Sequence, residues 1–160
     1  MGQLGVKNIL ESTLTLFDSH HGINSGERWA STNINRVVAD LIDLPYKPGY
    51  GSEFRMELLN DLDEPEKWLL LKVFFNVGGK IVDGWIVMIG YPRFPPALRL
   101  TSRPRCPIHG GPHSHVYPDG VLCWPSLMGE WSEWSDLYAD YLRVVLEILN
   151  KPTEHIVCRR

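Results

Sequence analysis

Two apolar runs separated by a pair of glycines constrain the fold of this chain most. The runs cover residues 68–75 and 81–89, with Gly78 and Gly79 between them. Glycine accepts the left-handed backbone that short hairpin turns need, so the pair indicates a tight turn. Neither run reaches the roughly 20 apolar residues of a membrane helix. We therefore expect a β-hairpin whose first strand is buried inside a sheet.

Strand signals lie on both sides of this hairpin. Apolar and charged residues alternate over residues 54–58, which is typical of a strand with one wet face. Residues 97–101 place Leu98 and Leu100 on one face and predict a short fourth strand. Three prolines within residues 91–96 separate it from the hairpin, because proline removes a backbone donor. The pattern predicts a four-stranded antiparallel meander.

Helical periodicity precedes and follows the strands. Apolar residues at three-and-four spacing predict a helix from Glu27 onwards, with Ser25 available near its start. A second helix is expected at residues 137–149, where Ser132 or Ser135 can cap it. The predicted order is helix, meander, long irregular loop and helix, which is an α+β fold.

Length and composition favour one domain over residues 1–160. The chain has 160 residues, of which 44% are hydrophobic and 22% charged, enough to bury a core. Residues 1–24 are interpreted as an N-terminal extension with a short amphipathic helix. We find no internal repeat and no linker that would divide the chain.

Charge and cysteine content limit the partners and the compartment. The formal net charge is -3 and basic runs are absent, so we expect neither nucleic acid nor a membrane as partner. Three cysteines cannot all pair within one chain, and the first residues do not resemble a secretory signal. We expect reduced thiols and a cytoplasmic location.

Residues 104–131 form the candidate site. This stretch holds two of the three cysteines and three of the six histidines, among many prolines and glycines. Such a mixture suits a shaped loop better than a helix or a strand.

The motifs around this loop resemble those of the ubiquitin-conjugating enzymes. The first motif is Tyr-Pro-Arg-Phe-Pro-Pro at residues 91–96, which precedes a predicted strand. The second is His-Ser-His at residues 113–115, with Cys123 eight residues after His115. Trp131 then precedes the last predicted helix. The family reads Tyr-Pro-x-x-Pro-Pro, strand, His-Pro-Asn, eight residues to the active-site Cys, then Trp and a helix. The order of elements matches over residues 27–150, and the close motif matches fall within 91–132.

This resemblance implies a ubiquitin-conjugating-enzyme-like fold and a carrier activity. Cys123 would hold the C-terminus of a protein as a thioester and pass it to a target. His113 would match the His of the tripeptide, and His115 would stand in for the Asn that steadies the loop and stabilises the oxyanion. An imidazole, with an ordinary pKa of about 6.5, also accepts a proton near neutral pH, so His115 is expected to act as general base as well.

The departures from the family pattern suggest a particular branch. Ser114 and His115 replace Pro-Asn, and the loop gains residues 106–112. These features resemble divergent bacterial relatives in anti-phage operons, found beside a cyclic-nucleotide synthase. The implied partners are a ubiquitin-like protein or the C-terminus of such a synthase, with an activating enzyme where one is needed.

Two of the candidate residues also have plain structural interpretations. Cys123 follows the turn signal Asp119-Gly120 and lies among apolar residues, so it is equally readable as a small buried side chain on a short strand. Asp119 either orients a target amine or caps the turn before Gly120. The three tryptophans nearby, Trp124, Trp131 and Trp134, are either core or a recognition patch.

A metal site is the competing hypothesis for the loop. Cys106, His109, His113 and His115 supply four legitimate zinc donors within ten residues. Their spacing matches no common zinc finger, and the residues between His109 and His113 would have to fold sharply. We expect no cofactor and keep zinc as the alternative.

Three hypotheses therefore stay open. The first is a cysteine acyltransferase that uses Cys123. The second is a catalytically inactive relative that binds a partner through the Trp-rich loop, and the third is a zinc-stabilised interaction domain.

Overall fold

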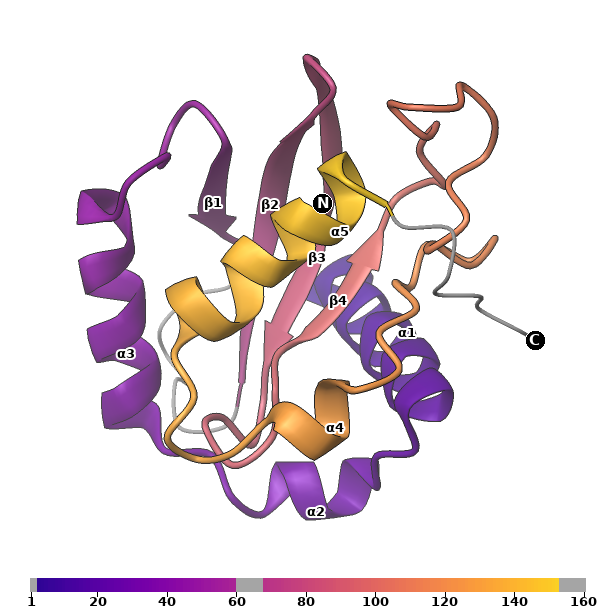
Figure 1. The fold of residues 1–160 in the computed structure, drawn as a ribbon. Helices are drawn as coiled ribbons and strands as arrows, with labels where there is room; N and C mark the ends of the chain where they lie inside the picture. Colours follow the sequence, from indigo (N-terminus) through magenta and orange to yellow (C-terminus); the bar gives the residue numbers. More distant parts are fainter. Residues whose placement is uncertain (1–2, 60–67, 153–160) are drawn as a thin grey trace.

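Four antiparallel strands form one sheet in chain order. The computed structural model describes residues 3–59 and 68–152. The strands are β1 (Phe54–Leu58), β2 (Leu69–Val77), β3 (Lys80–Met88) and β4 (Ala97–Leu100). The predicted meander is confirmed (Figure 1). The single-domain prediction over 1–160 also includes residues 1–2, 60–67 and 153–160, which lie outside the described residues.

The β2–β3 hairpin closes at the predicted glycine turn. Val77 pairs with Lys80, and the two glycines between them have positive φ angles of 61° and 87°. A residue with a Cβ atom would be strained there, which is why this turn fixes the register of the longest pair of strands.

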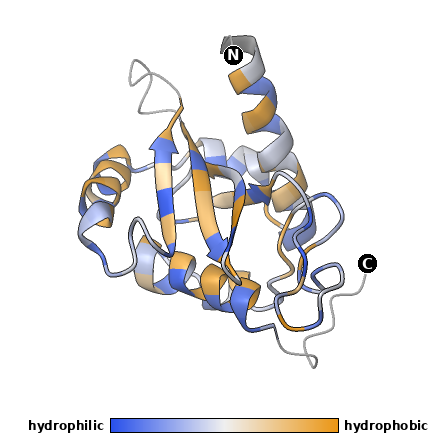
Figure 2. Ribbon diagram, turned by 90° about the horizontal axis from the view of Figure 1, so that it is seen from above, coloured by the Kyte–Doolittle hydropathy of each residue, from blue (hydrophilic) through white to orange (hydrophobic). Residues whose placement is uncertain are grey.

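Helices cover both faces of the sheet. α1 (Gln3–His21) contacts β3 and β4, whereas α5 (Arg143–Asn150) contacts β2. Figure 1 shows α5 in front of the strands and α1 behind them, and Figure 2 shows from above that the sheet stands between these two helices. The chain is therefore an α+β protein with an N-terminal helix, an antiparallel sheet and a C-terminal helix. No helix within the described residues is long and apolar enough to cross a membrane.

The helix expected from Glu27 is in fact two helices. α2 (Ser25–Trp29) and α3 (Ile34–Asp43) each begin after an asparagine, and a 3-10 turn (Leu44–Tyr46) follows α3. The Asn33 side chain accepts from the backbone N–H of Arg36 at 3.2 Å, and its own N–H donates to the Tyr91 carbonyl at 2.9 Å. A local cap and a distant partner thus hold Asn33 outside helical geometry and interrupt the predicted helix.

The caps predicted from serines are wrong. Ser25 lies inside α2, and Asn24 caps that helix instead. The last helical segment begins as a π-helix (Leu137–Leu142) that runs into α5. Its cap is Asp136, whose carboxylate accepts from the Ala139 N–H at 3.0 Å. The apolar face expected over residues 137–149 is present, but the helix is capped by the Asp136 carboxylate and not by Ser132 or Ser135. A short helix, α4 (Leu127–Glu130), precedes it and was not predicted.

Within the predicted N-terminal extension, the described residues 3–24 belong to the fold. Leu10, Leu14 and Phe17 are buried in the same core as the strands. At the end of α1, Asp18 forms an ion pair with the fully buried Arg28, 2.9 Å between Oδ1 and Nη2. A buried charge needs such a partner.

The Arg28 side chain joins three segments. Besides its ion pair with α1, its guanidinium donates to the carbonyl oxygens of Ile89 and Pro95, which lie between β3 and β4. The C-terminal end of α1 is thereby fixed against the sheet, and the two histidines that end it are fixed with it.

Candidate functional site

Cys123 and His115 face each other across a small antiparallel turn. The Cys123 N–H donates to the His115 carbonyl at 2.7 Å, and the Tyr117 N–H donates to the Val121 carbonyl at 2.8 Å. Val116 and Leu122 form a bridge between them. The eight-residue spacing between His115 and Cys123 therefore corresponds to one turn and the two short paired segments on either side of it.

Asp119 and Gly120 shape the tip of this turn. The Asp119 Oδ1 atom accepts from the Val121 N–H at 3.1 Å, so the predicted turn-capping role is confirmed. Gly120 has φ of 94°, and a Cβ there would lie 2.1 Å from the Leu100 carbonyl oxygen. Only glycine fits, because the turn rests directly on β4. Whether Asp119 also meets a target amine stays a prediction.

His113 braces the loop against α5. It is fully buried; Nε2 lies 3.0 Å from the Leu149 carbonyl, and Nδ1 accepts from the His115 N–H at 3.2 Å. This pattern places the proton on Nε2. Burial lowers the pKa of His113, so the ring stays neutral. His113 positions His115 and lies outside the hollows that Cys123 lines.

Cys123 lies between two hollows. One, of about 270 Å³, is lined by His115, Cys123, apolar residues and the last turn of α5. The other, of about 130 Å³, lies toward α1. Its lining residues are His20, His21, Tyr117, Cys123, Trp124, Pro125 and Met128. A group attached to the sulfur could therefore be reached from two sides.

The two described cysteines differ in state. Cys106 has a free thiol, whereas Cys123 is disulfide-bonded. The expectation of reduced thiols thus holds for Cys106 and is wrong for Cys123 in this structure. Burial raises the pKa of Cys106, but hydrogen bonds from His109, including its N–H at 3.4 Å from Sγ, outweigh this and lower it.

The four candidate zinc ligands form two separate pairs. The Cys106 sulfur lies 3.4 Å from Nδ1 of His109, and His113 lies beside His115 with ring centroids 5.8 Å apart. Within residues 3–59 and 68–152, no three His, Cys, Asp or Glu side chains are placed to hold a metal ion. The hydrogen bonds of His113 explain the separation, since both its ring nitrogens face protein atoms.

Sequence reasoning did not place α1 at this site, yet the last two residues of α1 contact the loop. His20 Nε2 lies 2.7 Å from Asp119 Oδ2, and the His20 ring stacks on Tyr117 with centroids 3.9 Å apart. His21 Nε2 lies 3.1 Å from the Leu122 carbonyl. Burial lowers the pKa of His21 to about 4, so it holds the loop as a neutral donor. Only the His-His pair before the helix break was visible in the sequence.

Two of the three loop tryptophans are core residues. Trp124 and Trp131 are buried against Tyr141, at centroid distances of 5.3 and 5.8 Å. Trp134 is 82% exposed. The core interpretation is therefore confirmed for the first two, and Trp134 alone remains available for recognition.

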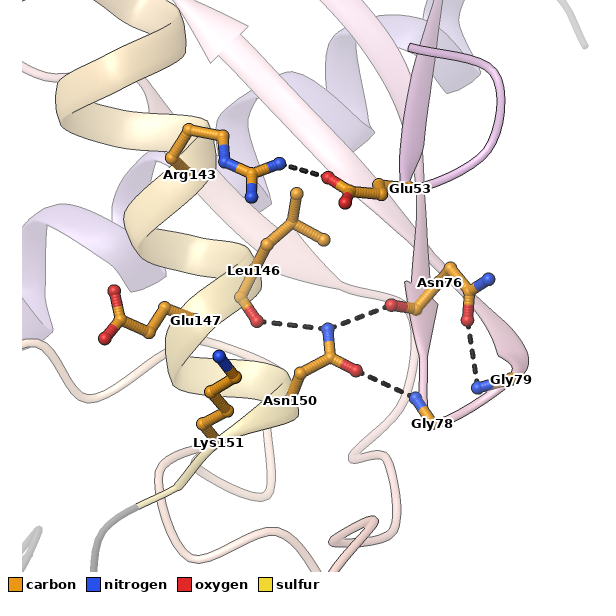
Figure 3. A pocket seen from close by; sticks show the side chains of 9 residues that line it. All are labelled: Glu53, Asn76, Gly78, Gly79, Arg143, Leu146, Glu147, Asn150 and Lys151. Atoms are coloured by element: carbon orange, nitrogen blue, oxygen red, sulfur yellow. Dashed lines mark hydrogen bonds and ion pairs between the residues drawn. The ribbon is translucent and has the colours of Figure 1, made fainter. Parts of the chain in front are cut away.

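A larger hollow lies on the other side of the last turn of α5. It has a volume of about 500 Å³ and is lined mainly by polar residues (Figure 3). Asn150 occupies its centre: it accepts from the Gly78 N–H at 2.9 Å and donates to the carbonyls of Asn76 and Leu146. Arg143 pairs with Glu53 at its edge. Its lining residues include no cysteine, serine or threonine.

Comparison with known proteins adds no assignment. No family model matches this chain, and no curated protein matches it.

Proposed function

We propose that this protein is a cysteine acyltransferase of the ubiquitin-conjugating type. Reduced Cys123 accepts the C-terminal carboxylate of a protein as a thioester and passes it to a target. One observation carries the proposal: the antiparallel pairing of Cys123 with His115 presents a thiol and an imidazole to the same hollow of about 270 Å³.

The chemistry follows from these two groups. A thiolate exchanges acyl groups readily, and the thioester keeps its carbonyl reactive towards an amine. His115 donates a hydrogen bond to the oxyanion that forms when the amine attacks. Its ring is only 2% exposed, and its backbone is tied to both His113 and Cys123, so the donor is held in place.

The carried protein and the setting follow from the sequence resemblance. We propose a ubiquitin-like protein or the C-terminus of a cyclic-nucleotide synthase as the acyl donor, with an activating enzyme where one is required. We propose that the protein acts in the cytoplasm of a bacterium, in defence against phage. There it would transfer the carried protein from Cys123 to a target such as the synthase.

The disulfide at Cys123 sets a condition for activity. A sulfur in a disulfide cannot form a thioester, so the carrier is the reduced protein. A reductant should therefore be required for loading.

The test uses a synthetic peptide thioester, which loads a reactive thiol without an activating enzyme. We expect the reduced protein to gain one peptide on Cys123, detected by intact mass, and Cys123→Ala to gain none while its unfolding temperature stays unchanged. Cys106→Ala is the matched control and should load normally. Cys123→Ser or Cys123→Lys should trap the acyl group from the natural donor as an ester or amide. Loading that depends on Cys106 and survives Cys123→Ala would contradict the proposal.

A catalytically inactive binding module is the second candidate. Two observations favour it: Cys123 is only 7% exposed, and the exposed Trp134 offers a contact to a partner. This candidate predicts no peptide on Cys123 even after reduction.

A further inference from the structure

We propose that His20 and Asp119 form the proton-accepting pair of this acyl transfer. His20 takes the proton from the attacking amine and Asp119 orients its ring. This inference rests on the proposed function of Cys123, and it adds a base supplied by α1, a helix that lies about a hundred positions from the loop in the sequence.

The geometry of the pair is that of an oriented base. His20 Nε2 lies 2.7 Å from Asp119 Oδ2, and stacking on Tyr117 at an interplanar angle of 11° holds the plane of the ring. The backbone behind it is fixed by the buried Asp18–Arg28 ion pair. A carboxylate that holds an imidazole in this way selects one tautomer.

The hydrogen bonds of Asp119 identify the tautomer. Burial opposes ionisation, but hydrogen bonds from His20 and from the Val121 N–H outweigh it and lower the pKa of Asp119. The carboxylate is therefore ionised near neutral pH and accepts from Nε2–H of His20, which leaves the lone pair on Nδ1. Among residues 3–59 and 68–152, no hydrogen bond to Nδ1 occurs.

The pair and the sulfur share a cavity. His20 and Cys123 both line the hollow of about 130 Å³, and His115 is not among its lining residues. His20 is 24% exposed and can return its proton to water, whereas His115 is 2% exposed. The two imidazoles therefore divide the work: His115 donates to the oxyanion, and His20 accepts the proton.

Other charged and titratable groups around His20 come from four elements. The Arg99 guanidinium of β4 donates to the Asp119 carbonyl at 2.8 Å, and the neutral ring of His21 adjoins it on α1. They include His21 of α1, Arg99 of β4, and Tyr117, Asp119 and Cys123 of the loop, while Asp18 of α1 and Arg28 of α2 act on the adjoining His21. Of these groups, Asp119 is the one whose carboxylate is hydrogen-bonded to the His20 ring within the described part of the chain.

The transfer step balances with these groups alone. The amine nitrogen forms a C–N bond with the thioester carbonyl, and the C–S bond breaks with its electrons on the Cys123 sulfur. The lysine ammonium loses one proton to Nδ1 of His20 before the nitrogen attacks, and the second proton lost by the nitrogen passes to the Cys123 sulfur. The products are an amide, a thiol and an imidazolium stabilised by Asp119.

The experiment loads reduced protein with the peptide thioester and follows its discharge. Free lysine tests the base, because its amine is protonated at neutral pH; hydroxylamine, which is already neutral there, needs no base. His20→Gln keeps a donor for Asp119 but cannot accept a proton. We expect it to slow discharge to lysine by about 10² to 10³-fold and to leave discharge to hydroxylamine within about threefold.

The pH profile separates the two histidines. The wild-type rate of discharge to lysine should rise with pH as the proton-accepting group loses its proton. We expect the rise to persist in His115→Asn and to vanish in His20→Gln. His109→Gln, the same exchange in a loop position outside both hollows, is the matched control and should behave as wild type.

Four outcomes decide the matter. If His20→Gln slows discharge to lysine and to hydroxylamine equally, His20 only supports the loop, and the inference is overturned. If the rise of the rate with pH is lost in His115→Asn and not in His20→Gln, the base is His115, and the inference is overturned as well. If His20→Gln does not fold, Asp119→Asn, which keeps the turn cap, should slow discharge to lysine by about tenfold or more. A wild-type protein that never loads overturns the proposed function and this inference together.

Discussion

Two hollows flank the last turn of α5, and both are lined by Glu147 and Lys151. The larger, of about 500 Å³, is polar, and its amides are engaged with backbone groups of the β2–β3 turn (Figure 3). The smaller, of about 270 Å³, is lined by more apolar than polar surface and includes Cys123 and His115.

This comparison shows that the larger hollow need not be the one that holds the candidate catalytic side chains. In the larger one, Asn150 bonds to the backbone of Gly78 and Asn76, so its polar groups hold two elements together. The smaller one brings together a nucleophile and a donor. We therefore expect substitutions in the larger hollow to change stability, and substitutions in the smaller one to change transfer.

The largest effect is expected at His115. His115→Ala should slow transfer from loaded Cys123 by about 10² to 10³-fold, the usual loss for one oxyanion donor, while loading itself stays largely intact. Single-turnover discharge of the peptide thioester measures this. His115→Asn should recover part of the rate, because the amide restores a donor.

Two results would contradict this role of His115. A loading defect as severe as the transfer defect would show that the residue only maintains the loop. His113→Ala with the same transfer defect and intact folding would move the donor to its neighbour.

A second prediction concerns acid stability on the α1 side of Cys123. The folded pKa of His21 is lowered to about 4 by burial, whereas an unfolded histidine titrates near 6.5. The unfolded chain therefore binds the extra proton between these values. The stability due to neutral His21 is complete above pH 6.5 and is lost as the pH falls toward 4, by on the order of 3 kcal/mol.

Denaturant unfolding at pH 7 and pH 4.5 checks this prediction. His21→Gln retains a donor for the Leu122 carbonyl but does not titrate, so its stability should fall less than that of the wild type over the same range. Equal pH dependence of the two proteins would show that His21 is charged or exposed in the folded state.

The hairpin that borders the larger hollow was predictable because its signals are local. Alternation and the glycine turn decide the strands within a few residues, and these predictions are confirmed. The break between α2 and α3 was missed because Asn33 is held by Tyr91, a residue far along the chain. The position of such a break depends on a tertiary partner, which periodicity does not report.

The candidate site divides in the same way. The spacing of His115 and Cys123 is the length of a local turn, and motif resemblance found it. The contacts of His20 and His21 with the loop span 99 and 101 positions. Periodicity carries no information at that distance, so only the folded chain brings α1 to the sulfur.

A smaller effect is expected in the larger hollow. Asn150→Ala removes the acceptor for the Gly78 N–H and the donor to the Asn76 carbonyl, and should cost about 1 kcal/mol of unfolding free energy. Glu147→Ala, on the same turn, is the control for stability and should change it by less than about 0.5 kcal/mol. A transfer defect in Asn150→Ala at unchanged stability would mean that the larger hollow takes part in the reaction.

The smallest effect is expected from metal removal, because hydrogen bonds alone account for the shape of the loop beside Cys123. The Cys106 N–H donates to the Gly111 carbonyl at 2.7 Å, and Arg103 donates to the His113 carbonyl at 3.0 Å. We expect less than stoichiometric zinc in elemental analysis, and no shift of the unfolding temperature on adding a chelator. The binding free energy of a structural zinc would instead contribute to folding, so removing the zinc would unfold the loop. About one zinc per chain, lost in Cys106→Ala or His109→Ala, would favour the zinc-stabilised interaction domain.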